Sequence, residues 1–349
     1  MSSLHARRDF LKQVALGAVA IPVLSPARAE AAQAALGWDS KLMGEGKYVT
    51  VDGVRTRYFE GGQGQPLVLI HGGQWPATAS ADGWSPIFDH LAQRFHVYAF
   101  DKIGMGMTDN PKTDADYSMD AIIRHAAGFI QTLGLRNIVL AGHSRGALPA
   151  ARIACDHPDL VTHLVIFDSN TLAPDDPNTP DRDDPPPIAR PPTREEIRAG
   201  DMRNRQYFGK QMITDRYVDA QFRIAQLPKI REVDVKFREL RDRWIRDNKT
   251  ELENNPNLGS NMGATTWWMY KAKYSTLDKI KAGGIKAPTI IIWGFNDPTA
   301  PYFLGVNLME TLSKVVPRSE LHILNQAGHF VFAEHPAEVT RLITGFVTG

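Results

Sequence analysis

Gly142-His143-Ser144-Arg145-Gly146 follows an apolar Ile-Val-Leu-Ala run at 138–141 and precedes a helix-compatible stretch at 147–156. A glycine-x-serine-x-glycine segment between a strand and a helix is typical of a sharp, strained turn that exposes the serine hydroxyl. Both glycines are needed because the neighbouring backbones approach too closely for a Cβ atom. The segment therefore predicts that Ser144 is a nucleophile.

A serine hydroxyl attacks well only when a base takes its proton and a carboxylate orients that base. Asp297 lies in a Trp-Gly-Phe-Asn-Asp-Pro segment directly after an apolar run at 289–292, and His329 follows the last predicted strand in the same way. Because parallel strands end at the same edge of a sheet, these side chains should meet Ser144 there. We predict a catalytic triad of Ser144, Asp297 and His329.

Each of the two partners also has a structural interpretation when taken alone. An aspartate between glycine, asparagine and proline is a common turn former, and a histidine after a strand often has a packing role. The order serine, acid, histidine at three strand ends favours catalysis over these interpretations. Asp168, which follows a run at 164–167, is the rival acid.

A tetrahedral intermediate needs backbone donors aimed at its oxyanion. His71-Gly72-Gly73 follows a strand predicted at 67–70, so we predict the Gly73 amide as the first donor and the Arg145 amide as the second. His71 is expected to hold the turn by bonding backbone groups. The Arg145 side chain has two interpretations, a pair with a substrate carboxylate or a salt bridge to a neighbouring acid.

Short apolar strand patterns alternate with helical patterns from residue 47 onward, which predicts a mostly parallel sheet covered on both faces. Asp52-Gly53 predicts a hairpin between 48–51 and 55–60. A Pro- and Asp-rich stretch interrupts the alternation, and a charged helical region follows it. We interpret 172–284 as an inserted helical cap between the core segments 30–171 and 285–349.

The composition sets further limits. The chain has 349 residues, a formal net charge of +1 and one cysteine. A near-zero charge gives no bulk attraction to nucleic acid, and one cysteine excludes an intramolecular disulfide and any Cys-x-x-Cys site. No nucleotide motif or metal cluster appears, so we expect a small-molecule substrate and no cofactor.

The first 29 residues resemble a twin-arginine signal peptide. Arg7-Arg8 precedes an apolar stretch at 14–24, and Ala27-Arg28-Ala29 fits a processing site. This pattern predicts that the twin-arginine export machinery is a partner and that the mature protein is periplasmic or secreted. The apolar stretch is shorter than the about 20 residues that span a bilayer as a helix.

Together these residues resemble the α/β-hydrolase superfamily, in particular its capped members. Further motifs look like those of the meta-cleavage-product hydrolases, which break carbon–carbon bonds during aromatic-ring degradation. These motifs are Asp101-x-x-Gly104-x-Gly106-x-Thr108-Asp109-x-Pro111, Trp293-Gly294-x-x-Asp297, Gly328-His329-Phe330 and Glu334-His335-Pro336. The resemblance implies an α/β-hydrolase fold with an eight-stranded sheet, and a cofactor-independent serine hydrolase that acts on a carboxylic ester or a carbon–carbon-cleavable ketone.

The chain departs from the carbon–carbon hydrolase pattern at His143, Arg145 and Phe330, where that group commonly has other residues. Ring-degradation intermediates arise in the cytoplasm, so export favours an ester. Arg145, Phe330, Trp267 and Trp268 are candidates for substrate contacts, although tryptophans at helical spacing also fit a face packed on the core.

Two alternatives use the same fold. A perhydrolase or haloperoxidase would employ the same triad, and a non-catalytic binding protein would retain the fold with an inactive site. The sequence leaves open whether the chain forms a homo-oligomer.

Overall fold

The computed structural model describes residues 38–75, 78–179, 187–250 and 267–349. The predicted signal peptide, 1–29, lies outside the described residues. Within the described ranges, no helix combines the length and apolarity needed to cross a membrane.

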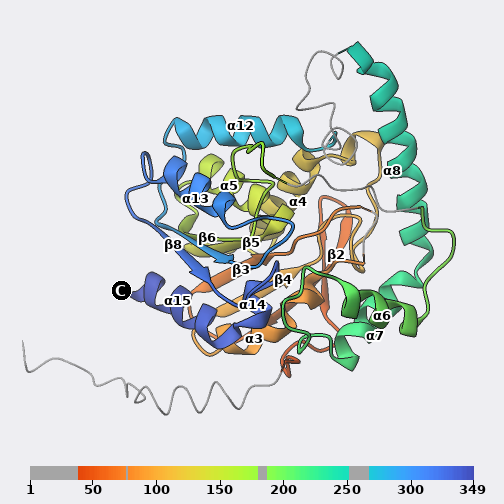
Figure 1. Cartoon of the computed structure of the whole chain (residues 1–349), viewed down its shortest axis with the longest axis horizontal. Helices are drawn as coiled ribbons and strands as arrows, with labels where there is room; N and C mark the ends of the chain where they lie inside the picture. The colour runs from red at the N-terminus through yellow and green to blue at the C-terminus, as the bar shows by residue number, and fades with distance from the viewer. Residues whose placement is uncertain (1–37, 76–77, 180–186, 251–266) are drawn as a thin grey trace, which may run out of the picture. The chain divides into compact units, whose positions relative to one another are not determined.

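One eight-stranded sheet forms the centre of the described structure, in the order β1-β2-β4-β3-β5-β6-β7-β8 (Figure 1). The strands are β1 (Lys47–Val51), β2 (Val54–Gly61), β3 (Pro66–Ile70), β4 (His96–Phe100), β5 (Ile138–His143), β6 (Val161–Phe167), β7 (Thr289–Gly294) and β8 (Ser319–Leu324). Only β1 and β2 run antiparallel to their neighbours, and β4, β3 and β5 to β8 pair in parallel. The predicted α/β-hydrolase fold with a mostly parallel sheet is confirmed.

Helices cover both faces of this sheet. On one face lie α4 (Met119–Thr132), α5 (Ala147–Asp156), α12 (Tyr270–Lys281) and α13 (Phe303–Leu312), and on the other lie α3 (Ser85–Leu91), α14 (Val331–Glu334) and α15 (Pro336–Thr348) (Figure 1). Successive strand residues point to opposite faces. In β3, Val68 and Ile70 join the core cluster under α4 and α5, whereas Leu67 and Leu69 join the cluster under α3 and α15.

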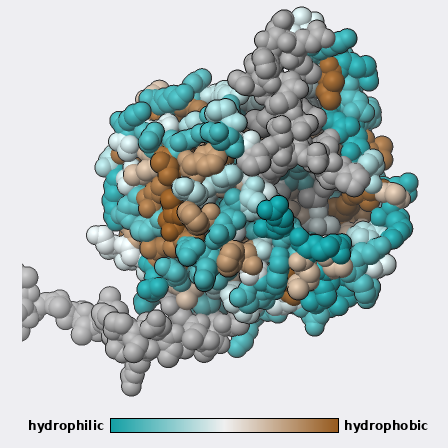
Figure 2. All heavy atoms as spheres, viewed as in Figure 1, coloured by the Kyte–Doolittle hydropathy of each residue, from teal (hydrophilic) through white to brown (hydrophobic). Residues whose placement is uncertain are grey.

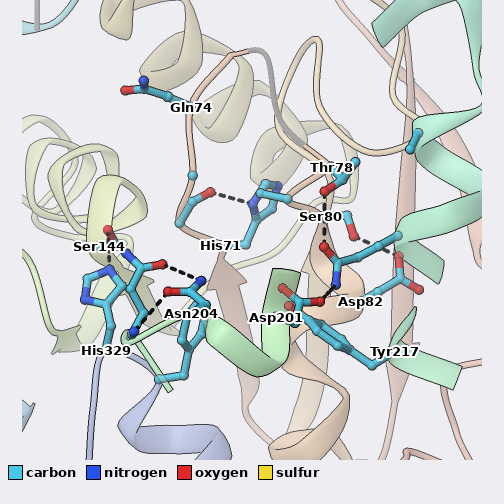
Figure 3. A pocket seen from close by; sticks show the side chains of 18 of the residues that line it. His71, Gln74, Thr78, Ser80, Asp82, Ser144, Asp201, Asn204, Tyr217 and His329 are labelled. Atoms are coloured by element: carbon cyan, nitrogen blue, oxygen red, sulfur yellow. Dashed lines mark hydrogen bonds between the residues drawn. The ribbon is translucent and has the colours of Figure 1, made fainter. Parts of the chain in front are cut away.

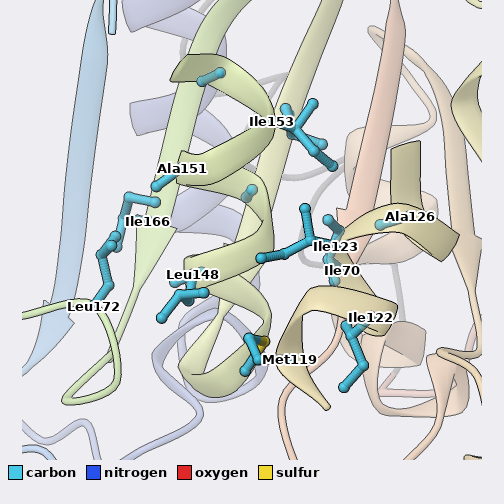
Figure 4. Packing of buried hydrophobic residues seen from close by; sticks show 14 of the residues in the cluster. Ile70, Met119, Ile122, Ile123, Ala126, Leu148, Ala151, Ile153, Ile166 and Leu172 are labelled. Atoms are coloured by element: carbon cyan, nitrogen blue, oxygen red, sulfur yellow. The ribbon is translucent and has the colours of Figure 1, made fainter. Parts of the chain in front are cut away.

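The core on the α4–α5 face shows why the two helices lie where they do. Apolar side chains recur every three or four residues along both helices, which gives each of them an apolar stripe. Figure 4 shows Ile122, Ile123 and Ala126 of α4 opposite Leu148 and Ala151 of α5, above the sheet. This packing fixes α5 directly behind the turn that carries Ser144.

The hairpin predicted at Asp52-Gly53 joins β1 to β2. Both residues have positive φ, +47° for Asp52 and +78° for Gly53, as two-residue hairpin turns require. The hairpin places β1 at one edge of the sheet, far from the parallel strands that form the site.

The predicted insertion at 172–284 contains α6 (Arg194–Arg203), α7 (Asp215–Ala225) and α8 (Pro228–Asp247), at the right of Figure 1. Thr193 and Glu196 form a capping box at the start of α6, and the Thr214 side chain caps α7. The last helix of the insertion, α12, packs against α5 and α13 of the sheet layers. The domain boundaries themselves stay predictions.

Hydrophobic residues gather on the visible surface over the area of α13 and β8 (Figure 2). The last strand, β8, is the edge of the sheet, and its residue Ile323 is 36% exposed.

Candidate active site

Ser144 sits on the turn between β5 and α5 with φ +52°, in the left-handed region that non-glycine residues rarely adopt. A Cβ atom on Gly142 would overlap the Gly146 carbonyl, and one on Gly146 would overlap the Ile70 carbonyl of the neighbouring strand. The two glycines therefore allow the sharp turn that the sequence predicts.

The three predicted triad residues lie together. His329 Nε2 is 3.0 Å from Ser144 Oγ, and His329 Nδ1 is 2.6 Å from Asp297 Oδ2. All three side chains are at least 95% buried. Asp297 lies in the loop after β7 and His329 in the loop after β8, so three strand ends supply the arrangement.

The Asp297 carboxylate is held by its other oxygen. Oδ1 accepts hydrogen bonds from the Thr299 amide at 2.7 Å, the Thr299 hydroxyl at 2.8 Å and the Ala300 amide at 3.0 Å. These three donors fix the carboxylate plane and leave Oδ2 for His329 Nδ1. The imidazole is thereby oriented with Nε2 toward the serine.

Asp168, the rival acid, occupies the neighbouring strand end after β6. It is fully buried, and its Oδ1 accepts a hydrogen bond from the Gly294 amide at 2.7 Å. Burial and the nearby Asp297 charge hold the pKa of Asp168 well above its usual range. The structure therefore pairs His329 with Asp297, whereas the Asp168 carboxyl contacts the end of β7 at Gly294.

The turn after β3 presents the predicted oxyanion donor. Gly73 has φ +75°, and its amide donates to no other described residue. The Gly73 amide belongs to the same peptide group as the Gly72 carbonyl. His71 Nδ1 donates to that carbonyl at 2.8 Å and so fixes the orientation of the peptide group. Burial lowers the pKa of His71, so the ring is neutral and its Nε2 accepts the Lys102 amide at 3.1 Å. His71 thus holds the turn, as predicted.

Lys102 was not among the residues singled out from the sequence. Its side chain is fully buried, and its Nζ donates to the Gly73 carbonyl at 3.0 Å. Burial, with Arg145 nearby, lowers the pKa of Lys102 well below its usual value. Its position two residues after the end of β4 was the only signal in the sequence. Its amide and its side chain together fix both peptides around Gly73.

Replacing Lys102 with Met is expected to lower kcat about tenfold with little change in KM. The loss should be smaller than the 10²- to 10³-fold that removal of an oxyanion donor costs, because Lys102 contacts the carbonyl of Gly73, the predicted donor residue, and does not line the pocket. If the variant lost activity because it misfolds, its free energy of unfolding would fall. We expect that free energy to stay the same or rise, because the substitution removes a buried amine that has no carboxylate partner.

The pH dependence of folding gives a second readout for the Lys102→Met variant. Because the pKa of Lys102 is lowered in the folded protein, the unfolded chain binds more protons between that pKa and about 10.4, so stability rises with pH there. Denaturant titrations from pH 7 to 9.5 should show this slope in the wild type and a flatter slope in the variant. An equal slope in both proteins would contradict the assignment.

The backbone of His329 is held on both sides. Its amide donates to the Gln206 carbonyl of the cap at 2.7 Å, and its carbonyl accepts from His143 Nε2 at 2.7 Å. Glu334 accepts from the Gly328 amide at 2.5 Å and from the cap's Gly209 amide at 2.8 Å. The segment after α6 is therefore tied directly to the loop that carries His329.

A pocket of about 880 Å³ opens above Ser144. Arg145 and Phe330, two of the predicted substrate contacts, line it. Trp267 and Trp268 lie elsewhere: Trp268 packs on Trp75 at 5.2 Å between ring centroids, and Trp267 packs on Phe237 at 5.3 Å. The core-packing interpretation describes the positions of both tryptophans.

Figure 3 shows Ser144 and His329 on one side of this pocket, with Asp82, Asp201 and Tyr217 on the other. The far wall is thus polar, with Asp201 from α6, Tyr217 from α7 and Asp82 from the short 3₁₀ helix Ala81–Trp84. Among the described residues, no group of three or more His, Cys, Asp or Glu side chains is arranged to hold a metal ion.

Known proteins resemble this chain over most of its length. It is 27% identical over 303 residues to a 2-hydroxymuconate semialdehyde hydrolase of Pseudomonas sp. (strain CF600), covering 86% of this chain and 93% of the relative. It is 38% identical over 128 residues to a 2-hydroxy-6-oxo-6-(2'-aminophenyl)hexa-2,4-dienoic acid hydrolase of Metapseudomonas resinovorans, although that match spans only 43% of the relative.

Solved structures support the fold. A serine hydrolase involved in carbazole degradation superposes with a TM-score of 0.61 at 23% identity, covering 87% of this chain and 98% of that one. A membrane phospholipase A gives a TM-score of 0.59 at 22% identity and covers 98% of both chains. The family model described as alpha/beta hydrolase fold matches residues 65–336, which include the whole predicted triad. This chain belongs to the α/β-hydrolase fold family.

Proposed function

We propose that this chain is a cofactor-independent serine hydrolase that attacks a carbonyl group through Ser144, His329 and Asp297. The observation that carries the proposal is the unbroken chain of contacts at the base of the pocket, from Asp297 Oδ2 to His329 Nδ1 at 2.6 Å and from His329 Nε2 to Ser144 Oγ at 3.0 Å. The family match and the relatives named as hydrolases support the same reaction class.

In this reaction Ser144 Oγ adds to the substrate carbonyl while His329 Nε2 takes its proton. Asp297 stabilises the imidazolium that forms, and the Gly73 and Arg145 amides donate to the oxyanion. His329 then returns the proton to the leaving group, and the bond to that group breaks. Water, deprotonated by His329, then attacks the acyl carbon. The bond from that carbon to Ser144 Oγ breaks, His329 returns the proton to Oγ, and the acid leaves.

Two classes of substrate are candidates, and they differ in the bond that is cleaved. A carboxylic ester is the first, in keeping with the predicted export of the chain. Hydrolysis of a carbon–carbon bond is the second, and the similarity to a 2-hydroxymuconate semialdehyde hydrolase over 86% of the chain favours it. A perhydrolase would use the same three side chains with peroxide in place of water.

A panel of p-nitrophenyl esters, assayed beside a ring-cleavage dienoate and a peroxide-dependent halogenation assay, separates these candidates. A fluorophosphonate that phosphonylates a serine nucleophile tests the shared step. We expect a single adduct on Ser144 in the folded wild type and none after Ser144→Ala. A wild type that is folded, takes no adduct and turns over no substrate would support the non-catalytic binding protein instead.

We also propose that residues 1–29 direct export through the twin-arginine machinery. Arg7→Lys with Arg8→Lys should leave the full-length chain in the cytoplasmic fraction, because this pathway reads the arginine pair. A shortened mature protein that still appears in the periplasm of cells producing the double variant would contradict the proposal.

A further inference from the structure

The far wall of the pocket carries a carboxyl group held in a defined orientation. Asp201 of α6 accepts a hydrogen bond on Oδ2 from Gln221 Nε2 of α7 at 2.7 Å. The Thr78 hydroxyl donates to Gln221 Oε1 at 3.2 Å, which directs the amide nitrogen toward Asp201. The second oxygen of the carboxyl, Asp201 Oδ1, accepts no hydrogen bond from any described residue.

Asp201 also differs in charge pairing from the other acids of the pocket. Asp82 forms an ion pair with Arg57, and Glu196 forms one with Arg190 at 2.5 Å. Asp201 has no ion-pair partner within the described ranges. Lys210, whose charge acts on Asp201, donates instead to the Asn204 carbonyl at 2.6 Å and the Tyr207 carbonyl at 2.9 Å.

Two tyrosines lie close to Asp201. Tyr207 and Tyr217 place their hydroxyls 3.0 Å apart beside this wall, and burial raises the pKa of both groups, so they stay protonated. Burial likewise raises the pKa of Asp201. Asp201 lines the pocket, and its Oδ1 is free to accept a hydrogen bond from a donor group on a ligand there.

We propose that Asp201, oriented by Gln221, forms a subsite for a hydroxyl or ammonium group on the part of the substrate remote from the cleaved carbonyl. The inference deepens the proposed function and rests on it. The same wall disfavours a carboxylate at that end, because two like charges would meet in a partly desolvated space. Figure 3 places Asp201 and Ser144 on opposite sides of the pocket, so a substrate reaching both must be extended.

The competing interpretation is structural: the Asp201–Gln221 bond would only hold α6 against α7. The variant Asp201→Asn separates the two, because its carboxamide oxygen still accepts the Gln221 bond while the charge and one acceptor are lost. Glu195→Gln is the matched control. Glu195 is exposed on the same helix, so this variant removes the same charge without changing the pocket.

The experiment uses four p-nitrophenyl hexanoates whose terminal carbon carries hydrogen, hydroxyl, ammonium or carboxylate. For the wild type and Glu195→Gln, we expect kcat/KM for the hydroxyl or the ammonium ester to exceed that of the unsubstituted ester about tenfold, mostly through KM. The carboxylate ester should be the poorest. Asp201→Asn should lose the preference and accept the carboxylate ester better.

Either donor, hydroxyl or ammonium, supports the subsite and identifies its chemistry. Identical ratios across the four esters in wild type and Asp201→Asn would overturn it while leaving the hydrolase proposal intact. If no ester is hydrolysed, the subsite is tested by calorimetry instead. Binding of the same four esters is measured for Ser144→Ala and for the double variant Ser144→Ala with Asp201→Asn. Tighter binding of a donor ester that disappears in the double variant supports the subsite, and equal binding overturns it.

Discussion

Ser144→Ala is expected to lower kcat about 10⁶-fold on any substrate that the wild type hydrolyses. The reason is geometric as well as chemical. The left-handed turn places one hydroxyl 3.0 Å from His329 Nε2, and no second serine or threonine hydroxyl bonds to that nitrogen in the described structure. The residual rate should come from binding and the oxyanion donors alone.

The fold should survive this change. Alanine keeps the Cβ atom, so the strain at φ +52° is unaltered, and only one hydrogen bond is lost. We expect the free energy of unfolding to change by about 1 kcal/mol or less. Ser313→Ala, an exposed serine at the end of α13, serves as the matched control and should keep kcat within about twofold. More than about 1% of wild-type kcat in purified Ser144→Ala would contradict a serine nucleophile.

The strands and the triad positions could be predicted because their signals are local. Parallel strands buried on both faces read as continuous apolar runs, and β5, β6 and β7 all carry such runs. In this fold the nucleophile, the acid and the histidine follow successive strands in that order along the chain. The sequence alone therefore predicts that Asp297 and His329 lie beside Ser144.

The remaining site residues depend on contacts between distant segments. His143 bonds to the His329 carbonyl across 186 positions of sequence, and Lys102 bonds to Gly73 across 29. Neither pairing has a sequence period or a motif spacing. Helical spacing similarly predicted an apolar face at Trp267 and Trp268 but could not say whether that face meets the pocket or the core. The structure places Trp268 in the core cluster and packs the partly buried Trp267 against it.

Asp297→Asn is expected to lower kcat about 10⁴-fold with the fold intact. Oδ1 accepts two backbone amides, from Thr299 and Ala300, so the asparagine oxygen must take that place. Its NH₂ group then faces His329 Nδ1, which has to accept a hydrogen bond. A neutral imidazole that accepts at Nδ1 carries its proton on Nε2 and cannot take the proton of Ser144. Steady-state kinetics at neutral pH measure the loss.

Asp168→Asn tests the rival acid and should behave in the opposite way. Burial and the Asp297 charge raise the pKa of Asp168, which favours the neutral carboxyl that asparagine resembles in shape and charge. We expect kcat of Asp168→Asn to stay within about threefold of the wild type. Because the pKa of Asp168 is raised in the folded protein, the folded chain binds more protons than the unfolded chain between about pH 3.9 and that raised pKa. The contribution of Asp168 to the free energy of unfolding therefore falls as the pH rises through this interval. Denaturant titrations between pH 4 and 7 should show that decline in the wild type and less of it in Asp168→Asn. If Asp168 were instead the catalytic acid, the two variants would exchange their kinetic effects, since only one carboxylate can hold Nδ1 of His329 in the reactive tautomer.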